Sequence, residues 1–336
     1  MRQPYRRFVQ TDFEGSAEWL KSGPPAASLA IPGTGTRRTN EVHNRPMGRP
    51  VIAGSGTSEA VSRTPPVCLT IAGFDPSSGA GVTADLKSFA AHGIYGVAAI
   101  TALTVQSTQG VRGMEPVRPS IFRETLECLA ADLPLAGVKL GMLASAGLVS
   151  EAEHFLRVRP ELRERVVLDP VLQSSSGTAL LDAEGTALLR ERLLGVVGWV
   201  TPNLDELALL TRVEVRTREQ VPAAAERLAR HAANAGNPGI AIVVTGGHLD
   251  RPDDYLLLQG KGVWLQGERI ETRSTHGTGC AFSSALLAGL VLGRAGVLAV
   301  EGAKRYVAGA LRAAYPVGQG RGPLHHFFAF EPSIPE

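Results

Sequence analysis

The segment that decides the fold is residues 67–92, VCLTIAGFDPSSGAGVTADLKSFAAH. It opens with the apolar run Val67–Ala72, which predicts a buried strand, and it closes with Ala84–His92, which has the apolar spacing of a helix. Gly-rich residues join the two, and a second apolar run, Val97–Leu103, follows the helix. Strand, helix and strand in this order are typical of a crossover unit in a parallel sheet.

The same alternation continues to about residue 330 and predicts one α/β domain. Further strands are expected at Val138–Met142, Val166–Leu168, Trp199–Thr201 and Ile240–Thr245. Further helices are expected at Ile121–Asp132, Glu184–Leu194, Leu204–Leu210, Pro222–Ala235 and Ala281–Gly293. An antiparallel hairpin is expected from Tyr255–Leu258 and Val263–Leu265, joined by Gln259, Gly260, Lys261 and Gly262. The predicted fold is therefore a mainly parallel central sheet with helices on both faces and a small antiparallel hairpin.

Residues 1–66 differ in composition from the rest of the chain. They contain 15 Gly or Pro and 12 Ser or Thr and no sustained apolar period, which predicts a disordered extension. The alternative interpretation is a start codon assigned too early, with Met47 as the next candidate. The predicted organisation is an extension at 1–66, a folded domain at 67–330 and a tail at 331–336.

Composition and charge exclude several classes of function. The 336 residues carry 34 Lys or Arg and 32 Asp or Glu, and a net charge of +2 is too small for a surface dedicated to nucleic acid. No run reaches the ~20 apolar residues of a membrane span, and no secretory signal is indicated. Cys68, Cys128 and Cys280 are too widely spaced for a disulfide framework or a Cys-rich zinc site, which favours a reducing cytoplasm.

Unusual residues follow the predicted strands at the carboxyl edge of the sheet, where open α/β sheets bind their ligands. They are the loop 73–81 after the first strand, Gln106 after the second, Asp169 after the fourth, and Asn203 with Glu206 after the fifth. Each residue alone would be weak evidence, but their common position makes this edge the predicted site.

The strongest local signal is residues 275–280, THGTGC, directly before the apolar helix. Its two glycines let backbone N–H groups turn toward one point at the positive end of a helix dipole, which predicts a site for a transferring phosphoryl group. There Cys280 would be favoured as a thiolate, able to take a proton or to act as a nucleophile. The alternative is a capping turn with a small buried thiol. A metal pair of His276 and Cys280 is disfavoured because no third ligand stands at a useful spacing.

Several motifs together resemble the hydroxymethylpyrimidine/phosphomethylpyrimidine kinases of thiamine biosynthesis, which have the ribokinase-like fold. They are Asp75–Gly81, Ile100–Leu103, Gln106, Lys139–Leu143, Leu168–Val171, Thr201–Glu206, Gly246–His248, His276–Cys280 and Gly322–Phe327. The resemblance covers about residues 67–330 in order. It implies ATP- and Mg²⁺-dependent phosphorylation of 4-amino-5-hydroxymethyl-2-methylpyrimidine, then of its monophosphate, to give the diphosphate used to build thiamine.

The resemblance also implies roles for single residues. At the transferring phosphoryl group, Cys280 matches the catalytic base, and the anion hole matches Gly277, Thr278 and Gly279. The pyrimidine pocket matches Gln106, Gly73, Asp85 and Met142. The nucleotide site matches Asp169, Asn203, Thr245 and Gly247, and Mg²⁺ matches Glu206 with Asn203, largely through water.

Two of these assignments also have an interpretation from the residues themselves. A carboxamide such as that of Gln106 offers an acceptor and a donor side by side, which can pair with an exocyclic amine and the adjacent ring nitrogen. The alternative is an ordinary solvated Gln at a strand end. Asn203 followed three residues later by Glu206 is the pattern of a helix capping box, so these two residues could cap a helix, order a metal, or do both.

One departure from the family pattern concerns charge. Thr245 stands where the family usually has Lys before Gly-Gly-His, which should weaken neutralisation of the nucleotide phosphates unless another Lys or Arg reaches in. Two alternative functions stay open at this point. One is a pyridoxal kinase of the same branch, and the other is a non-catalytic pyrimidine-binding sensor. The resemblance alone implies a homodimer.

Overall fold

The computed structural model describes residues 64–330, except 175, 176 and 248. The chain divides into two units, Met1–Ala60 and Val61–Glu336, and every described residue belongs to the second. The predicted tail at 331–336 and all but the last three residues of the predicted extension at 1–66 lie outside the described residues.

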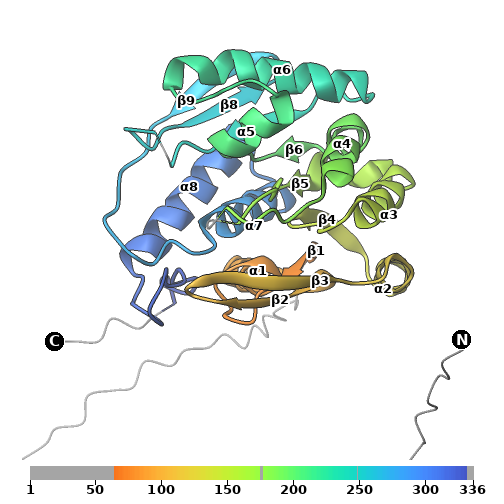
Figure 1. Ribbon diagram of the computed structural model, residues 1–336, viewed down its shortest axis with the longest axis horizontal. Coiled ribbons are helices and arrows are strands. Elements are labelled where there is room, and N and C mark those ends of the chain that lie inside the picture. Colours follow the sequence, from red (N-terminus) through yellow and green to blue (C-terminus); the bar gives the residue numbers. More distant parts are fainter. Residues whose placement is uncertain (1–63, 175–176, 248, 331–336) are drawn as a thin grey trace, which may run out of the picture. The chain divides into compact units, whose positions relative to one another are not determined.

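A nine-stranded sheet forms the centre of the described part (Figure 1). Its order is β3-β2-β1-β4-β5-β6-β7-β8-β9, in which β2 to β7 run parallel, β3 is antiparallel to β2 at one edge, and β8 and β9 are antiparallel at the other. The strands are β1 Val67–Phe74, β2 Tyr95–Ser107, β3 Gly110–Pro116, β4 Leu135–Leu140, β5 Val166–Leu168, β6 Trp199–Val200, β7 Ala241–Val244, β8 Asp254–Leu258 and β9 Lys261–Leu265. The predicted mainly parallel sheet is confirmed.

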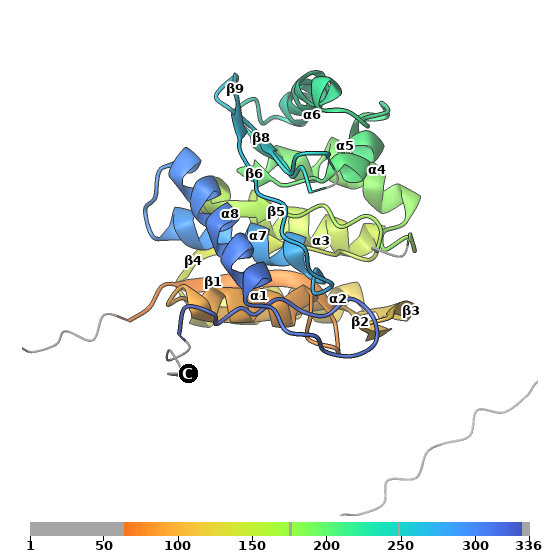
Figure 2. The same ribbon diagram turned by 90° about the vertical axis from the view of Figure 1, so that its left-hand side faces the viewer.

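Helices cover both faces of this sheet (Figures 1 and 2). One layer consists of α1 Gly81–Ala91, α7 Thr278–Val291 and α8 Gly296–Arg312. The other consists of α2 Pro119–Asp132, α3 Ala146–Arg157, α4 Ala183–Glu191, α5 Leu204–Thr211 and α6 Val221–Asn234. Among the helices of the described residues, none combines the length and the apolar content needed to cross a membrane.

Each face of the sheet has its own hydrophobic core, and β1 shows how the sequence builds both. Leu69 and Ile71 point into the core beneath α2–α6, whereas Cys68 points into the core beneath α1, α7 and α8, and all three are fully buried. Because both faces are covered, a parallel strand is a continuous apolar run, which is why these strands were visible in the sequence.

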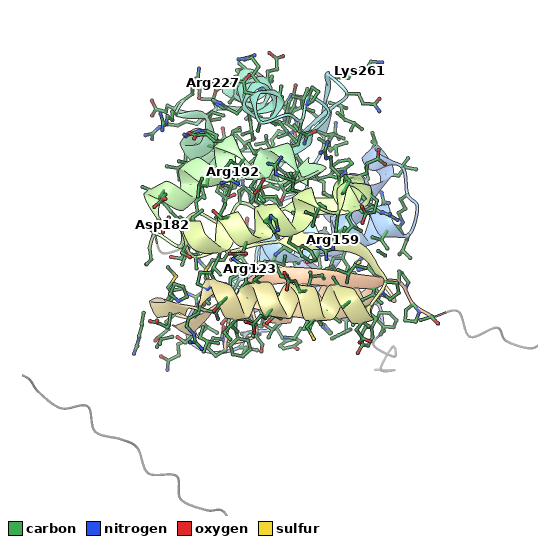
Figure 3. All side chains as sticks on the ribbon, turned by 90° about the vertical axis from the view of Figure 1, so that its right-hand side faces the viewer. Arg123, Arg159, Asp182, Arg192, Arg227 and Lys261 are labelled. Atoms are coloured by element: carbon green, nitrogen blue, oxygen red, sulfur yellow. The ribbon has the colours of Figure 1, made fainter. Side chains whose placement is uncertain are left out.

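Ion pairs tie the outer helices of the larger layer together. Arg123 on α2 reaches Glu151 on α3, and Arg192, just after α4, reaches Glu153 on α3. Figure 3 shows Arg123 and Arg192 on the outer surface of these helices. The Arg123–Glu151 pair is open to water on the arginine side and contributes about 0–1 kcal/mol, so apolar burial is the main force that holds the layer to the sheet.

The predicted antiparallel hairpin is confirmed, but its predicted four-residue loop is wrong. Lys261 and Gly262 belong to β9, so the loop is Gln259-Gly260 alone, with φ of 51° and 73°. Two positive φ angles give the tight turn whose twist matches the strands. Within β9, position 262 requires a glycine because the Tyr255 hydroxyl occupies the place where a side chain would stand. The ribbon strand β3 was not predicted, since its half-exposed sequence GVRGMEP lacks an apolar run.

A chain that begins at Thr64 is expected to unfold at the same temperature as the full chain, because the sheet starts at Val67. The cut should spare Pro66, whose carbonyl oxygen accepts a hydrogen bond from the Tyr95 amide at 3.0 Å where β2 starts. Thermal midpoints of the two chains, measured side by side, check this. A midpoint several degrees lower in the shorter chain would mean that the removed residues stabilise the domain.

Candidate active site

The predicted site residues lie along the carboxyl edge of the parallel strands. Gly73 is the last residue but one of β1, beside the loop that leads to α1. Met142 follows β4, and its side chain packs on Gly73, with its Cε 2.3 Å from the point where a Cβ of Gly73 would stand. Thr245, after β7, pairs through its backbone with Asn203, after β6. Gly247 is further along, in an exposed turn, with open space around its Cα.

Asp75 organises the loop between β1 and α1. Its Oδ1 accepts hydrogen bonds from the amide and the hydroxyl of Ser77, and its Oδ2 accepts from the amides of Gly79 and Ala80. His276 Nε2 lies 2.8 Å from the same Oδ2. Burial alone would raise the pKa of Asp75, but the hydrogen bonds from His276 and Ser77 outweigh it and lower the pKa. Asp75 is therefore an ionised anchor for this loop, a role that the sequence did not reveal.

The loop before α7 is interlocked with the Asp75 loop through two glycines. A Cβ on Gly79 would lie 2.2 Å from the His276 ring, and a Cβ on Gly277 would lie 1.9 Å from the Gly79 carbonyl oxygen. Gly277 also has φ of 84°, which favours glycine. The helix begins at Thr278 and not at Ala281 as predicted, so Gly279 and Cys280 lie in its first turn.

Gln106 lies on β2 between two polar neighbours. One terminal atom of its carboxamide is 3.1 Å from Thr104 Oγ1 and the other is 3.1 Å from His276 Nε2. His276 thus contacts both Asp75 and Gln106. The sequence brought Gln106 and His276 forward separately, but no local pattern joins residues 170 positions apart.

A buried charged cluster lies against the first two turns of α7. Lys139 and Asp85 are fully buried, and Lys139 Nζ lies 3.0 Å from Asp85 Oδ2 and 3.9 Å from Asp169 Oδ2. Asp85 also accepts hydrogen bonds from the hydroxyls of Thr70 and Ser284. Sequence reasoning missed Lys139 as a site residue. The available signal was a lysine inside an otherwise apolar strand, which burial can tolerate only with a partner.

Cys280 does not have the protonation state that was predicted from its place at a helix start. Burial raises the pKa of its thiol to about 12, although the Lys139 ammonium and the Gly81 amide act in the opposite direction. Asp85 and Asp169 raise the pKa further. The helix dipole argument was wrong here because desolvation and two nearby carboxyl groups outweigh it. Cys280 is a neutral thiol at pH 7.

Asn203 and Glu206 form the predicted capping box. The Glu206 amide donates to Asn203 Oδ1, and the Asn203 amide donates to Glu206 Oε2, each at 2.9 Å. Glu206 is nonetheless poorly stabilised as an anion, since burial and the neighbouring Asp169 raise its pKa well above the usual range. Burial also raises the pKa of Asp169. Two adjacent carboxyl groups in this state would both be stabilised by a cation.

The residues that the structure describes contain no group of three or more His, Cys, Asp or Glu placed to hold a metal ion by themselves. A protein that binds Mg²⁺ through nucleotide phosphates and water needs only one or two carboxylates. Glu206 and Asp169 fit that requirement.

A hollow of about 350 Å³ lies elsewhere, where α4, α5 and α6 end, and Arg190, Arg212, Arg227 and His231 line it. Arg227 Nε donates there to the carbonyl oxygen of Thr211, the last residue of α5. Cations are favoured at helix C-termini because carbonyl groups without intrahelical partners gather there. This basic lining therefore has a structural cause, and the chemistry of the protein is to be sought at the strand ends.

Known proteins share this sequence and this arrangement. The family profile described as phosphomethylpyrimidine kinase matches residues 75–325. The chain is similar to the hydroxymethylpyrimidine/phosphomethylpyrimidine kinase of Rhizobium meliloti, with 40% identity over 266 residues that cover 78% of this chain and 97% of that protein.

Solved structures agree. A Bacillus subtilis pyridoxal kinase in complex with ADP has a TM-score of 0.70 at 29% identity, covering 80% of this chain and 99% of that one. A phosphomethylpyrimidine kinase from Clostridium difficile has a TM-score of 0.61 at 32% identity, covering 72% and 98%.

Proposed function

The chain belongs to the phosphomethylpyrimidine kinase family, and from this premise we propose that it phosphorylates the hydroxymethyl group of 4-amino-5-hydroxymethyl-2-methylpyrimidine and then the resulting monophosphate, at the expense of ATP, in thiamine biosynthesis. The observation that carries the proposal is the family match over 75–325, which includes every residue of the site except Gly73. ATP as the phosphoryl donor follows from membership of a kinase family.

The pyrimidine is proposed to lie over the ends of β1 and β2. Gln106 offers its carboxamide to the ring edge, and Met142, beside Gly73, offers an apolar contact to the ring face. Asp85 closes the pocket floor, with its carboxylate already bonded to Thr70, Lys139 and Ser284. Because its partners are fixed, Asp85 presents a preorganised negative charge and does not need to move when substrate binds.

The phosphoryl group is proposed to pass at the start of α7. The N–H groups of Gly277, Thr278 and Gly279 surround the transferred group at the positive end of the helix. In the first step the oxygen of the hydroxymethyl group attacks phosphorus and ADP leaves, while the proton of the alcohol goes to Cys280 in the small fraction of molecules whose thiol is ionised to the thiolate. In the second step the attacking group is a phosphate oxygen that is already ionised, so little proton transfer is required.

Mg²⁺ fits the edge formed by Glu206, Asn203 and Asp169, where two buried carboxyl groups have raised pKa values. When bound, the ion would neutralise charge on the phosphate oxygens. The proposed ligation is largely through water, because the capping box already engages Glu206 Oε2 and Asn203 Oδ1. Thr245 provides no cation in this region, so the metal and the backbone N–H groups carry more of the phosphate charge than in relatives with Lys at this position.

Pyridoxal phosphorylation is the second candidate function, favoured by the likeness to the Bacillus subtilis pyridoxal kinase. A third, a non-catalytic pyrimidine sensor, is disfavoured because the glycines and the thiol of the anion-hole loop are all present. The deciding experiment is turnover of the purified chain with ATP and each alcohol in turn. A kcat/KM that is higher for pyridoxal than for the pyrimidine would overturn the first assignment.

A homodimer in the cytoplasm, implied by the family resemblance, stays part of this proposal.

Replacing Gln106 by leucine is expected to raise KM for the pyrimidine by a factor of about 5 to 150, equivalent to about 1–3 kcal/mol for a lost bidentate contact. The KM for ATP should stay within about twofold, since Gln106 lies on β2 and the nucleotide site lies across the sheet. Steady-state kinetics with each substrate varied separately measure both constants. An unchanged pyrimidine KM would remove Gln106 from base recognition.

A further inference from the structure

We propose that the segment Gly318–Pro323, here called the strap, ties the tip of the β2–β3 ribbon to the anion-hole loop (residues 275–280), and that Thr108 at this tip is a positioning residue that sets where Gln106 stands relative to the phosphoryl group. The inference rests on the function proposed above. It assigns a role to the loop after α8, which Figure 2 shows in blue beside β2 and β3.

The central sheet does not support the part of β2 that carries Gln106. Pairing of β2 with β1 ends at Leu103, opposite Phe74, so beyond this residue β2 pairs only with β3. A two-stranded ribbon is at best marginally stable by itself. The register also shifts between Val105 and Gln106, and a bulge of this kind bends a strand locally. The position of Gln106 therefore depends on what holds the ribbon.

Polar side chains hold the base of the ribbon. The Thr104 hydroxyl donates to the carbonyl oxygen of the last residue of β1 at 2.9 Å, and the Gln106 carboxamide lies 3.1 Å from His276 Nε2. The tip is the turn formed by Thr108 and Gln109, between the end of β2 and the start of β3. These contacts at the base leave the tip to be held by another part of the chain.

The strap holds this tip through its backbone. The Arg321 amide donates to the Thr108 carbonyl oxygen at 2.9 Å, and the Gly320 amide donates to Thr108 Oγ1 at 3.2 Å. A Cβ on Gly320 would lie 1.9 Å from the same carbonyl oxygen, and a Cβ on Gly318 would lie 2.4 Å from Thr108 Oγ1. Both positions therefore require glycine for the strap to approach Thr108 this closely.

The other end of the strap is fixed to the anion-hole loop. The His276 amide donates to the Gly322 carbonyl oxygen at 3.0 Å, and His276 pairs through its backbone with Pro323. Gly322 packs on Ser274, whose Oγ lies 2.6 Å from the point where a Cβ of Gly322 would stand. Leu324, directly after the strap, is buried in the core beneath α1, α7 and α8. The strap is therefore anchored on the phosphoryl side, and the ribbon is the partner that can move.

This arrangement separates substrate binding from substrate alignment. A loosened ribbon keeps the Gln106 carboxamide and can still bind the pyrimidine, but it no longer holds the acceptor oxygen at the phosphoryl group by the start of α7. Transfer needs the reacting atoms within about 3–3.5 Å of each other, and a displacement of about 1 Å can lower the rate about 100-fold. Loss of the strap contacts should therefore lower kcat and leave the affinity for the pyrimidine nearly unchanged.

The test uses the full chain with Gly320→Ala, whose added methyl group would meet the Thr108 carbonyl oxygen. We expect kcat to fall by about 10- to 100-fold for the alcohol and by a similar factor for the monophosphate, because both acceptors present their pyrimidine ring to Gln106. The dissociation constant of the alcohol, measured by calorimetric titration without ATP, should stay within about threefold. Gly239→Ala is the matched control, since no atom of the described residues lies within 4 Å of its added methyl group, and kcat should not change.

Thr108→Val and Thr108→Ser test the tip itself, since valine lacks the oxygen that accepts from the Gly320 amide and serine keeps it. We expect kcat to be about 2- to 10-fold lower with valine and to stay within about twofold with serine. Thermal midpoints show whether each variant is folded, and if Gly320→Ala does not fold, the valine and serine variants decide.

An unchanged kcat in folded Gly320→Ala, equal kcat values for the valine and serine variants, or a weakened pyrimidine affinity with kcat retained would overturn the inference and leave the strap a structural loop. If the unaltered chain phosphorylates neither the pyrimidine alcohol nor pyridoxal, it is the proposed function that fails.

Discussion

Replacing Cys280 by alanine will lower kcat for the pyrimidine alcohol by about 10²- to 10⁴-fold, the usual effect of removing a general base, and will lower it far less for the monophosphate. The two acceptors differ in one respect that matters here. The alcohol must lose a proton as the new O–P bond forms, whereas the monophosphate is already ionised at pH 7. In the proposed mechanism both steps use the same backbone N–H groups at the start of α7, which the substitution leaves in place.

The pH dependence should reveal the same role. Because the pKa of the Cys280 thiol is raised to about 12, only a very small fraction is thiolate at pH 7. As long as the pH is below that pKa, the thiolate fraction, which is the fraction able to accept a proton, grows tenfold for each unit by which the pH rises. We therefore expect kcat for the alcohol to rise steeply between about pH 7 and pH 9 and kcat for the monophosphate to stay nearly level.

Turnover of each purified acceptor, measured across this pH range for the unaltered chain and for Cys280→Ala, checks both expectations. Cys280→Ser should behave like the alanine variant, since a hydroxyl is a far poorer base than a thiolate. Equal losses for the two acceptors would mean that Cys280 acts through the shape of the anion hole. A negligible loss for the alcohol would remove Cys280 from catalysis.

The fold could be predicted from the sequence where burial leaves a local pattern. Val166–Leu168 was assigned with its observed bounds, because a strand covered on both faces is apolar at every position. Strand β3 could not be found in this way, since Gly110–Pro116 is half-exposed and its pairing with β2 is set by the hairpin geometry. The place of the site followed from topology, because the ends of parallel strands meet at one edge.

The electrostatics of the site could not be predicted, because they depend on residues that are distant in the sequence. Asp75 and His276 are 201 positions apart, and nothing near either residue indicates the other. The protonation state of Cys280 was predicted from a local feature, the helix start, but its thiol pKa is set by burial next to Asp85 and Asp169. Lys139 is the clearest case, since it links two carboxylates that come from a helix and from a different strand end.

Replacing Lys139 by methionine is expected to destabilise the domain by about 3–5 kcal/mol at pH 7, the usual cost of removing one partner from a buried ion pair. Lys139 and Asp85 are fully buried, so no water can replace the lost ammonium group.

The Lys139 charge also lowers the pKa of Asp169, which burial raises. Without it, that pKa rises further above its value in the unfolded chain. A carboxyl group whose pKa is higher in the folded than in the unfolded chain destabilises the fold at a pH above its unfolded pKa, where the unfolded chain ionises it more easily. The loss in unfolding free energy should therefore be complete at pH 7 and should shrink as the pH falls toward about 4.

Urea unfolding at pH 7 and pH 5 measures the deficit and its pH dependence. Arg123→Met is the matched control, because it breaks an ion pair with Glu151 in which the arginine is exposed and should cost less than about 1 kcal/mol. Asp85→Asn added to Lys139→Met should recover part of the loss, since it removes the carboxylate that was left unpaired. If Lys139→Met alone lies within 1 kcal/mol of the unaltered chain, the cluster is not the closed, water-free arrangement described here. In that case the preorganised charge assigned to Asp85 in pyrimidine binding would lose its physical basis.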